Sequence, residues 1–196
     1  VDGPYSVFGE AVPEVSSAND AAAVELGLRF TPQSDGFVTG VRFYKGAANT
    51  GLHEGSLWDA AGTKLNSVVF SQESSDGWQT ALFTSPVEVF AGVQYTVSYS
   101  APNGGYSMTD QYWPYMANTT APLEVPTVVG AAAAGVFGEV GAMPDRAWRE
   151  SNYFVDVVFD SSDTSPLRAA ARSPQPDASS IALDAPIEIT FTRNAD

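Results

Sequence analysis

Four stretches of the chain alternate between apolar and polar side chains with a period of two residues. These stretches are VELGLRF (24–30), FVTGVRFY (37–44), QYTVSYS (94–100) and NYFVDVVF (152–159). In QYTVSYS, Tyr95, Val97 and Tyr99 share one face, and small polar residues share the other. Because successive side chains of a strand point to opposite faces, each stretch predicts a strand with one buried and one solvated face.

Shorter segments extend this pattern and are separated by turn residues. The additional strand candidates are GSLWD (55–59), LNSVVF (65–70), WQTALF (78–83) and VEVF (87–90). Turns are indicated by TPQSDG (31–36), AAGT (60–63), SSDGW (74–78) and APNGG (101–105). Many short strands without a long helical pattern favour an all-β fold. We therefore predict an antiparallel β-sandwich of jelly-roll type over residues 1–160, with Trp58 and Trp78 in its core or at its edge.

The composition changes after Asp160. Residues 161–176, SSDTSPLRAAARSPQP, have the character of a linker. Residues 177–196 then show two short strand patterns, with Ile187, Ile189 and Phe191 in alternation. This last segment resembles the opening strands of bacterial immunoglobulin-like repeats. We predict that it is the truncated start of such a domain.

Charge and composition exclude several classes of function. Lys and Arg number 9 and Asp and Glu number 23, so the net charge is −14. Such an acidic surface repels phosphate backbones and anionic membranes, so we expect no nucleic-acid partner. The absence of cysteine excludes a disulfide scaffold, a zinc–thiolate site and a cysteine nucleophile. The longest apolar run, VVGAAAAGVFG (128–138), is too short to span a bilayer, so we expect no membrane insertion.

His53 is the only histidine of the chain and lies in the glycine-rich segment NTGLHEGSLWD. A Ser-His-carboxylate triad would have to use this residue, but the chain contains no Gly-x-Ser-x-Gly motif. One imidazole cannot form a histidine metal cluster, although mixed ligation with carboxylates stays open. We interpret the segment as a shaped connection between strands in which His53 binds backbone carbonyls. A ligand-binding role is the alternative, and we expect no catalytic residue in the chain.

Three segments together resemble a known family. They are ELGLRFTPQSDGFVTGVRFYKGAANTGLHEGSLWDAAGT, GWQTALFTSPVEVFAGVQYTVSYSAPNGGY and SNYFVDVVF. In this order they are similar to the domain of unknown function 4082 family, over roughly residues 5–160. The resemblance implies an accessory module of a large secreted bacterial protein, often beside immunoglobulin-like repeats. It therefore implies an extracellular location, secreted or attached to the cell surface, and neighbouring domains of the parent chain as partners.

An aromatic loop is the strongest candidate for a ligand-binding surface. The segment MTDQYWPYM (108–116) follows Tyr106, and Trp148 lies in the polar sequence DRAWRE. Aromatic rings offer flat faces to sugar C–H groups, and neighbouring polar groups hydrogen-bond hydroxyls. We predict that a polysaccharide or a cell-surface glycan binds a surface formed by Tyr106, Asp110, Tyr112, Trp113, Tyr115 and Trp148. In the alternative interpretation, Trp113 and Tyr115 fold back as a lid on the sandwich.

A structural Ca²⁺ is a second candidate. Many jelly-roll carbohydrate modules hold this ion between an early acidic residue and an aspartate in a C-terminal Y-x-V-D-V strand. The chain is similar at Glu25 and Asp156. Backbone carbonyls would have to complete the six to eight oxygen ligands that Ca²⁺ takes. The alternative is an ion pair from either carboxylate to Arg29 or Arg42.

These observations lead to one expected function and two alternatives. We expect a non-catalytic carbohydrate-binding or adhesion module of a secreted multidomain bacterial protein. The first alternative is a structural spacer without a ligand. The second is a glycan-active hydrolase, but with 23 acidic residues a suitably spaced carboxylate pair would occur by chance.

Overall fold

The computed structural model describes residues 3–113, 119–127, 130–162, 169–173 and 186–191. By its internal contacts the chain divides into two compact units, Val1–Ser162 and Asp163–Asp196. No helix among the described residues has the length and apolar character needed to cross a membrane.

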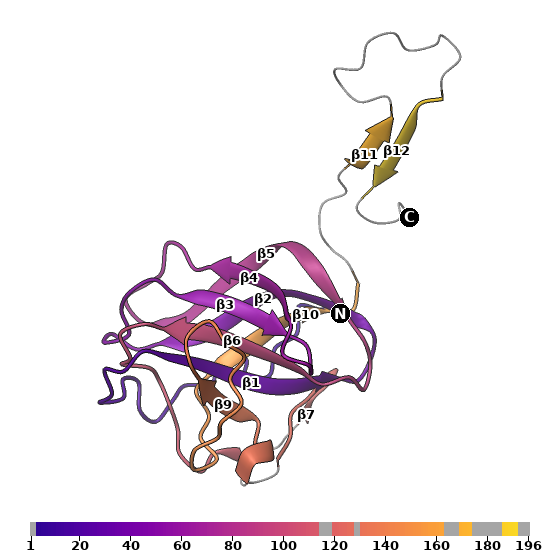
Figure 1. Cartoon of the computed structure of the whole chain (residues 1–196). Coiled ribbons are helices and arrows are strands. Elements are labelled where there is room, and N and C mark those ends of the chain that lie inside the picture. Colours follow the sequence, from indigo (N-terminus) through magenta and orange to yellow (C-terminus); the bar gives the residue numbers. More distant parts are fainter. Residues whose placement is uncertain (1–2, 114–118, 128–129, 163–168, 174–185, 192–196) are drawn as a thin grey trace. The chain divides into compact units, whose positions relative to one another are not determined.

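The first unit consists of two sheets in which all strand pairs are antiparallel. The larger sheet has the order β4 (Lys64–Val69), β3 (Glu54–Trp58), β6 (Tyr95–Ala101), β1 (Val24–Pro32), β8 (Leu123–Glu124) and β7 (Thr119–Thr120), and β9 (Gly135–Gly138) also pairs with β1. The smaller sheet has the order β10 (Val155–Asp160), β2 (Gly36–Lys45) and β5 (Gly77–Val89). Figure 1 shows β3, β6 and β1 side by side in one layer and β2 with β10 in the layer behind it. The predicted all-β antiparallel sandwich is therefore confirmed, and its jelly-roll type stays a prediction.

The core lies between the two sheets, where the alternating apolar positions meet. Leu26, Leu28 and Phe30 of β1 have 1% of their surface or less exposed, as do Val155 and Val157 of β10. At roughly 25 cal/mol for each Å² of apolar surface removed from water, this burial is the main stabilising contribution to the fold. The period-two pattern in the sequence thus identified the inward faces of both strands correctly.

The outer face of β6 differs from the prediction, because it is buried as well. Every residue of β6 is buried, including Ser98, whose hydroxyl donates to Glu25 Oε1 at 2.6 Å. The segment that follows β9 covers this region: the Gly141 N–H donates to Glu25 Oε2, and a Cβ atom on Gly27 would lie 2.8 Å from Pro144 Cγ. The polar alternation therefore indicates a polar layer under a loop, and not a solvated face.

Two strand candidates join into one strand, and both tryptophans lie where the sequence placed them. WQTALF and the first three residues of VEVF are parts of the 13-residue β5, which pairs with β2 across an irregularity at residues 38–40. Trp58 is buried on β3 and donates its indole N–H to Ser98, and Trp78 is half-buried at the start of β5. A short 3-10 helix, η2 (Gly130–Ala132), precedes β9.

The second unit contains one described hairpin, β11 (Ala169–Ser173) paired with β12 (Glu188–Phe191). Residues 169–173, within the predicted linker at 161–176, are thus one strand of this hairpin, and the linker itself stays a prediction. These residues form a strand because the apolar alternation of residues 187–191 supplies a pairing partner. The predicted immunoglobulin-like start at residues 177–196 stays a prediction, and most of it lies outside the described residues.

Candidate functional site

A groove of about 440 Å³ opens beside the start of β1, and Trp148 is its most exposed aromatic residue. We call it the Trp148 groove. Four parts of the chain line it: residues 20–24 up to the start of β1, the segment after β6 with Tyr106, the end of β9 with Phe137, and residues 146–153. The groove exists because β9 pairs with β1 on one side and the chain after β6 returns past the start of β1 on the other.

Three aromatic rings form the inner wall of the groove. Tyr153 is buried and meets Tyr106 edge-to-face at a centroid distance of 5.9 Å. Tyr153 also meets Phe137 edge-to-face at 6.5 Å. Burial raises the pKa of Tyr153 and, together with the nearby Asp20 carboxylate, raises the pKa of Tyr106 to about 12. Both phenols therefore keep their protons at physiological pH and act as neutral, amphipathic surfaces.

Asp20 supplies a fixed carboxylate at the rim. Its Oδ2 accepts a hydrogen bond from the Tyr106 hydroxyl at 3.1 Å, and its Oδ1 accepts one from the Ala22 N–H at 2.9 Å. The Asp20 carbonyl in turn accepts the Gly105 N–H at 2.8 Å. Gly104 and Gly105 have φ of +63° and +66°, and a Cβ on Gly104 would lie 2.0 Å from the Asp20 carbonyl oxygen. Only glycine allows this close approach, so the turn APNGG positions Asp20.

Trp148 is displayed by a turn with unusual backbone geometry. Its side chain is 60% exposed, and the two residues that follow it, Arg149 and Glu150, have φ of 47° and 50°. Such left-handed conformations cost non-glycine residues free energy and require support from the surroundings. This support comes from backbone hydrogen bonds. The Gln111 N–H donates to the Arg149 carbonyl, and the Tyr112 N–H donates to the Glu150 carbonyl.

Asp110 belongs to this support. One of its oxygens accepts the Ser151 hydroxyl at 2.8 Å, and the other lies 3.1 Å from Arg149 Nη1. We predicted that Asp110 binds a sugar directly, but it does not line the groove. The structure therefore assigns Asp110 a positioning role beneath Trp148.

The prediction of a sugar-binding face is wrong for Trp113. Its side chain is 1% exposed, and its indole N–H donates to the Ser151 carbonyl at 3.0 Å. Tyr112 is half-buried and meets Trp113 edge-to-face at 5.0 Å, so it does not line the groove either. The ring of Phe8 packs against both residues. The alternative of a lid on the sandwich therefore holds for Trp113, and Tyr115 lies outside the described residues.

The chain does not bring Glu25 and Asp156 together. Their neighbours Leu26 and Val157 face the core from opposite sheets, so the two carboxylates lie on opposite outer faces of the sandwich. Among the described residues, no three His, Cys, Asp or Glu side chains form a metal-binding group. The prediction that one Ca²⁺ joins Glu25 and Asp156 is therefore wrong.

Each of the two carboxylates instead has its own protein partners. Asp156 accepts the N–H groups of Val7, Phe8 and Val157 and forms an ion pair with Arg42 at 3.9 Å. The predicted alternative of an ion pair is thus correct for Asp156. Burial raises the pKa of Asp156 to about 6 and also raises that of Glu25. Both are buried acids that link a covering loop to a sheet.

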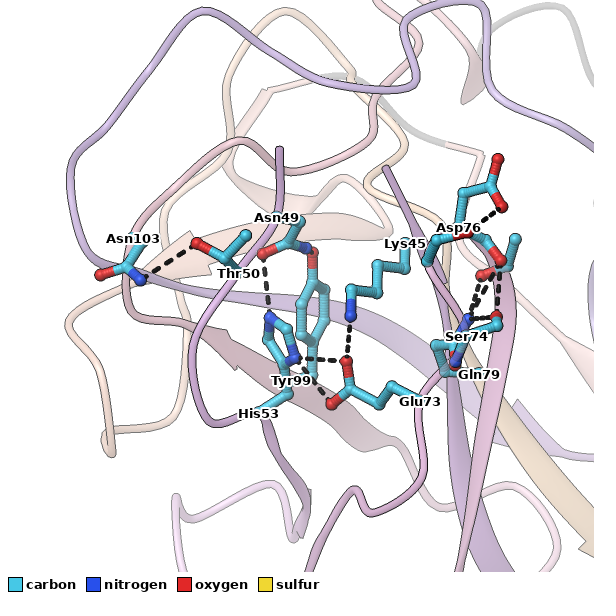
Figure 2. A network of polar contacts seen from close by, with 12 residues as sticks. Lys45, Asn49, Thr50, His53, Glu73, Ser74, Asp76, Gln79, Tyr99 and Asn103 are labelled. Carbon is cyan, nitrogen blue, oxygen red and sulfur yellow. Dashed lines mark hydrogen bonds and ion pairs between the residues drawn. The ribbon is translucent and has the colours of Figure 1, made fainter. Parts of the chain in front are cut away.

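His53 is buried within the connection between β2 and β3 (Figure 2). Its Nδ1 lies 2.8 Å from a carboxylate oxygen of Glu73, and its Nε2 lies 3.0 Å from Asn49 Oδ1. The Asn49 amide donates to the Tyr99 hydroxyl, and Lys45 forms an ion pair with Glu73 at 2.7 Å. The interpretation as a shaped connection is confirmed, but the expected backbone partners are wrong because side chains bind both ring nitrogens. No serine hydroxyl contacts His53 in the described part of the chain.

The sequence identified two residues of the Trp148 groove, Tyr106 and Trp148, and missed Asp20, Phe137 and Arg146. Phe137 lies on β9, a four-residue strand flanked by glycine that has no clear alternation. Arg146 reaches the groove because its backbone pairs with Phe137, and its guanidinium lies 4.8 Å from the Phe137 ring centroid. The only local signal was the composition of DRAWRE, an aromatic residue between charged ones.

Comparison with known proteins gives a family but no assigned activity. A family model described as domain of unknown function (DUF4082) matches residues 10–155. The match includes every groove residue, from Asp20 to Tyr153. No curated protein matches the chain.

Proposed function

The chain belongs to the DUF4082 family, and on that premise we propose that it is a non-catalytic carbohydrate-binding module of an extracellular multidomain protein. The observation that carries the proposal is the Trp148 groove: an exposed indole beside an aromatic wall with fixed polar groups at its rim. Pyranose rings have apolar C–H faces and polar equatorial edges, and this combination of surfaces complements both.

The carboxylates that line the groove favour a binding role over a catalytic one. A glycosidase needs one carboxyl group that protonates the leaving group and a second that acts on the anomeric carbon or on water. Asp20 and Glu139 both line the groove, but the Asp20 carboxylate already accepts hydrogen bonds at both oxygens. Such a fixed acceptor suits recognition of a sugar hydroxyl.

The expected affinity is modest. An open groove buries only part of a sugar, and hydrogen bonds to hydroxyls largely replace hydrogen bonds to water. We expect dissociation constants on the order of micromolar to millimolar, with Trp148 as the main contributor to binding.

A glycan array followed by calorimetry tests this proposal. The first unit should bind one class among plant, fungal and bacterial polysaccharides, and Trp148→Ala should lose most of that binding. Phe90→Ala is the matched control, because Phe90 is a 50% exposed aromatic residue that does not line the groove. Absence of binding to every glycan of the array, or equal binding by both variants and the wild type, would favour the structural-spacer alternative.

A further inference from the structure

The Trp148 groove contains a cation with unused hydrogen-bonding capacity, Arg146. Lys45, Lys64 and Arg149 each have a carboxylate oxygen within 3.1 Å. In the described part of the chain, no carboxylate lies within ion-pair distance of the Arg146 guanidinium. Arg146 is exposed, so its guanidinium is accessible to a ligand in the groove.

The Arg146 guanidinium also packs against one ring of the aromatic wall. Its carbon atom lies 4.8 Å from the Phe137 ring centroid, a cation–π contact that orients the planar group. The Arg146 backbone forms a two-way bridge with Phe137, with N···O distances of 2.7 and 3.1 Å. A guanidinium fixed in this way loses little side-chain freedom when it binds a ligand.

We infer, resting on the proposed function, that the groove binds a glycan bearing an isolated carboxylate, a uronic-acid-type residue in an otherwise neutral chain, and that Arg146 is its specificity-determining residue. Two parallel N–H donors match a carboxylate better than they match a hydroxyl group. Stacking on Trp148 would hold the sugar ring while Arg146 binds its carboxylate.

The other charges of the groove limit this ligand to a single carboxylate. Asp20 and Glu139 line the same groove, and the whole molecule carries a net charge of −14. A polyuronate would bring further carboxylates close to these two acids, at distances where salt screens little. A lone carboxylate opposite Arg146 gains a short-range pair and meets less of that repulsion.

A matched pair of ligands tests the inference. One is an oligosaccharide of neutral pyranoses with a single glucuronic acid residue, and the other is the same compound with the carboxyl group reduced to a hydroxymethyl group. Calorimetry on the wild-type chain should give roughly fivefold tighter binding of the acid. Arg146→Gln should remove this preference and keep the weaker binding of the reduced compound. A polygalacturonate fragment should bind more weakly than the single-acid compound.

The control variant is Lys64→Gln, which removes a cation that pairs with Glu54 on the neighbouring strand β3 and does not line the groove. It should retain the preference for the acid. Equal binding of both compounds by the wild type, or an acid preference that survives Arg146→Gln, would overturn the inference and leave the proposed function intact. Absence of binding to either compound and to all array glycans would overturn both.

Discussion

Two aromatic regions, each of which includes residues of the segment that follows β6, differ in their exposure to solvent. Tyr106 contributes to an open groove whose rim carries the 60% exposed Trp148. A few residues later, Trp113 is 1% exposed and packs among other rings. We call this second region the buried aromatic cluster; it contains Phe8, Trp78, Tyr112, Trp113 and Phe154.

The difference arises from the segments that cover each region. Residues 5–8 run along β10, with Tyr5 paired to Phe159 and the N–H groups of Val7 and Phe8 bound to Asp156. As a result, the centroid of the Phe8 ring lies 6.3 Å from that of Trp78 and 5.8 Å from that of Trp113. Among the residues that the structure describes, no comparable segment covers Trp148. Exposure of an aromatic residue in a loop is therefore decided by a distant part of the chain.

The largest expected effect concerns the buried aromatic cluster. Trp113→Ala should lower the free energy of unfolding by about 3–5 kcal/mol, because it removes a large buried ring and leaves the Ser151 carbonyl without its donor. Urea unfolding measures this change. An effect below about 1 kcal/mol would mean that Trp113 does not belong to the core.

Trp148→Ala should show the opposite pattern. Glycan binding should weaken at least about tenfold, while the free energy of unfolding changes by less than about 0.5 kcal/mol, since the side chain is largely solvated. Calorimetry and urea unfolding on the same preparation measure both quantities. A large loss of stability would contradict the proposed division of roles between the two regions.

The contribution of Asp156 to the free energy of unfolding should depend on pH. Burial raises the pKa of Asp156 from 3.8 to about 6, so the folded state holds a proton that the unfolded state releases. The stability that Asp156 contributes should therefore fall as pH rises from about 4 to 6. Relative to Asp156→Asn, which does not titrate, the wild type should lose roughly 1 kcal/mol between pH 5 and pH 7. A constant difference between the two proteins across this range would contradict the assignment.

The smallest expected effect comes from the groove rim. Tyr106→Phe keeps the aromatic wall but removes the hydroxyl that donates to Asp20. We expect a loss of about 0.5–1 kcal/mol in binding, or two- to fivefold, because a partly exposed hydrogen bond contributes little. Titration calorimetry with the same glycan measures it. Binding that stays unchanged would show that Asp20 needs no support from Tyr106.

The sequence predicted the fold more completely than the site. Period-two alternation located β1, β2, β6 and β10, because local chain geometry links that period to the two faces of a strand. It did not reveal that the outer face of β6 is buried, since the cover comes from residues more than 35 positions further along the chain. Burial by a distant loop leaves no local pattern.

The candidate site was predicted in part for the same reason. Trp148 and Tyr106 were identifiable from composition alone, but Trp113 has the same local signature and a different environment. Asp20 and Arg146 could not be assigned to the groove from the sequence, because they are 126 positions apart. They come together only because β9 pairs with β1 and because the turn at Gly104 positions Asp20.

Acrylamide quenching of tryptophan fluorescence, with and without a saturating glycan, tests whether the Trp148 groove is the binding surface. Trp58 and Trp113 are buried and Trp78 is half-buried, so Trp148 should dominate quenching in the free protein, and Trp148→Phe should remove most of it. The bound glycan should protect the wild type from quenching and leave the quenching of Trp148→Phe unchanged. Quenching of the wild type that is the same with and without bound glycan would contradict the assignment of the Trp148 groove as the binding surface.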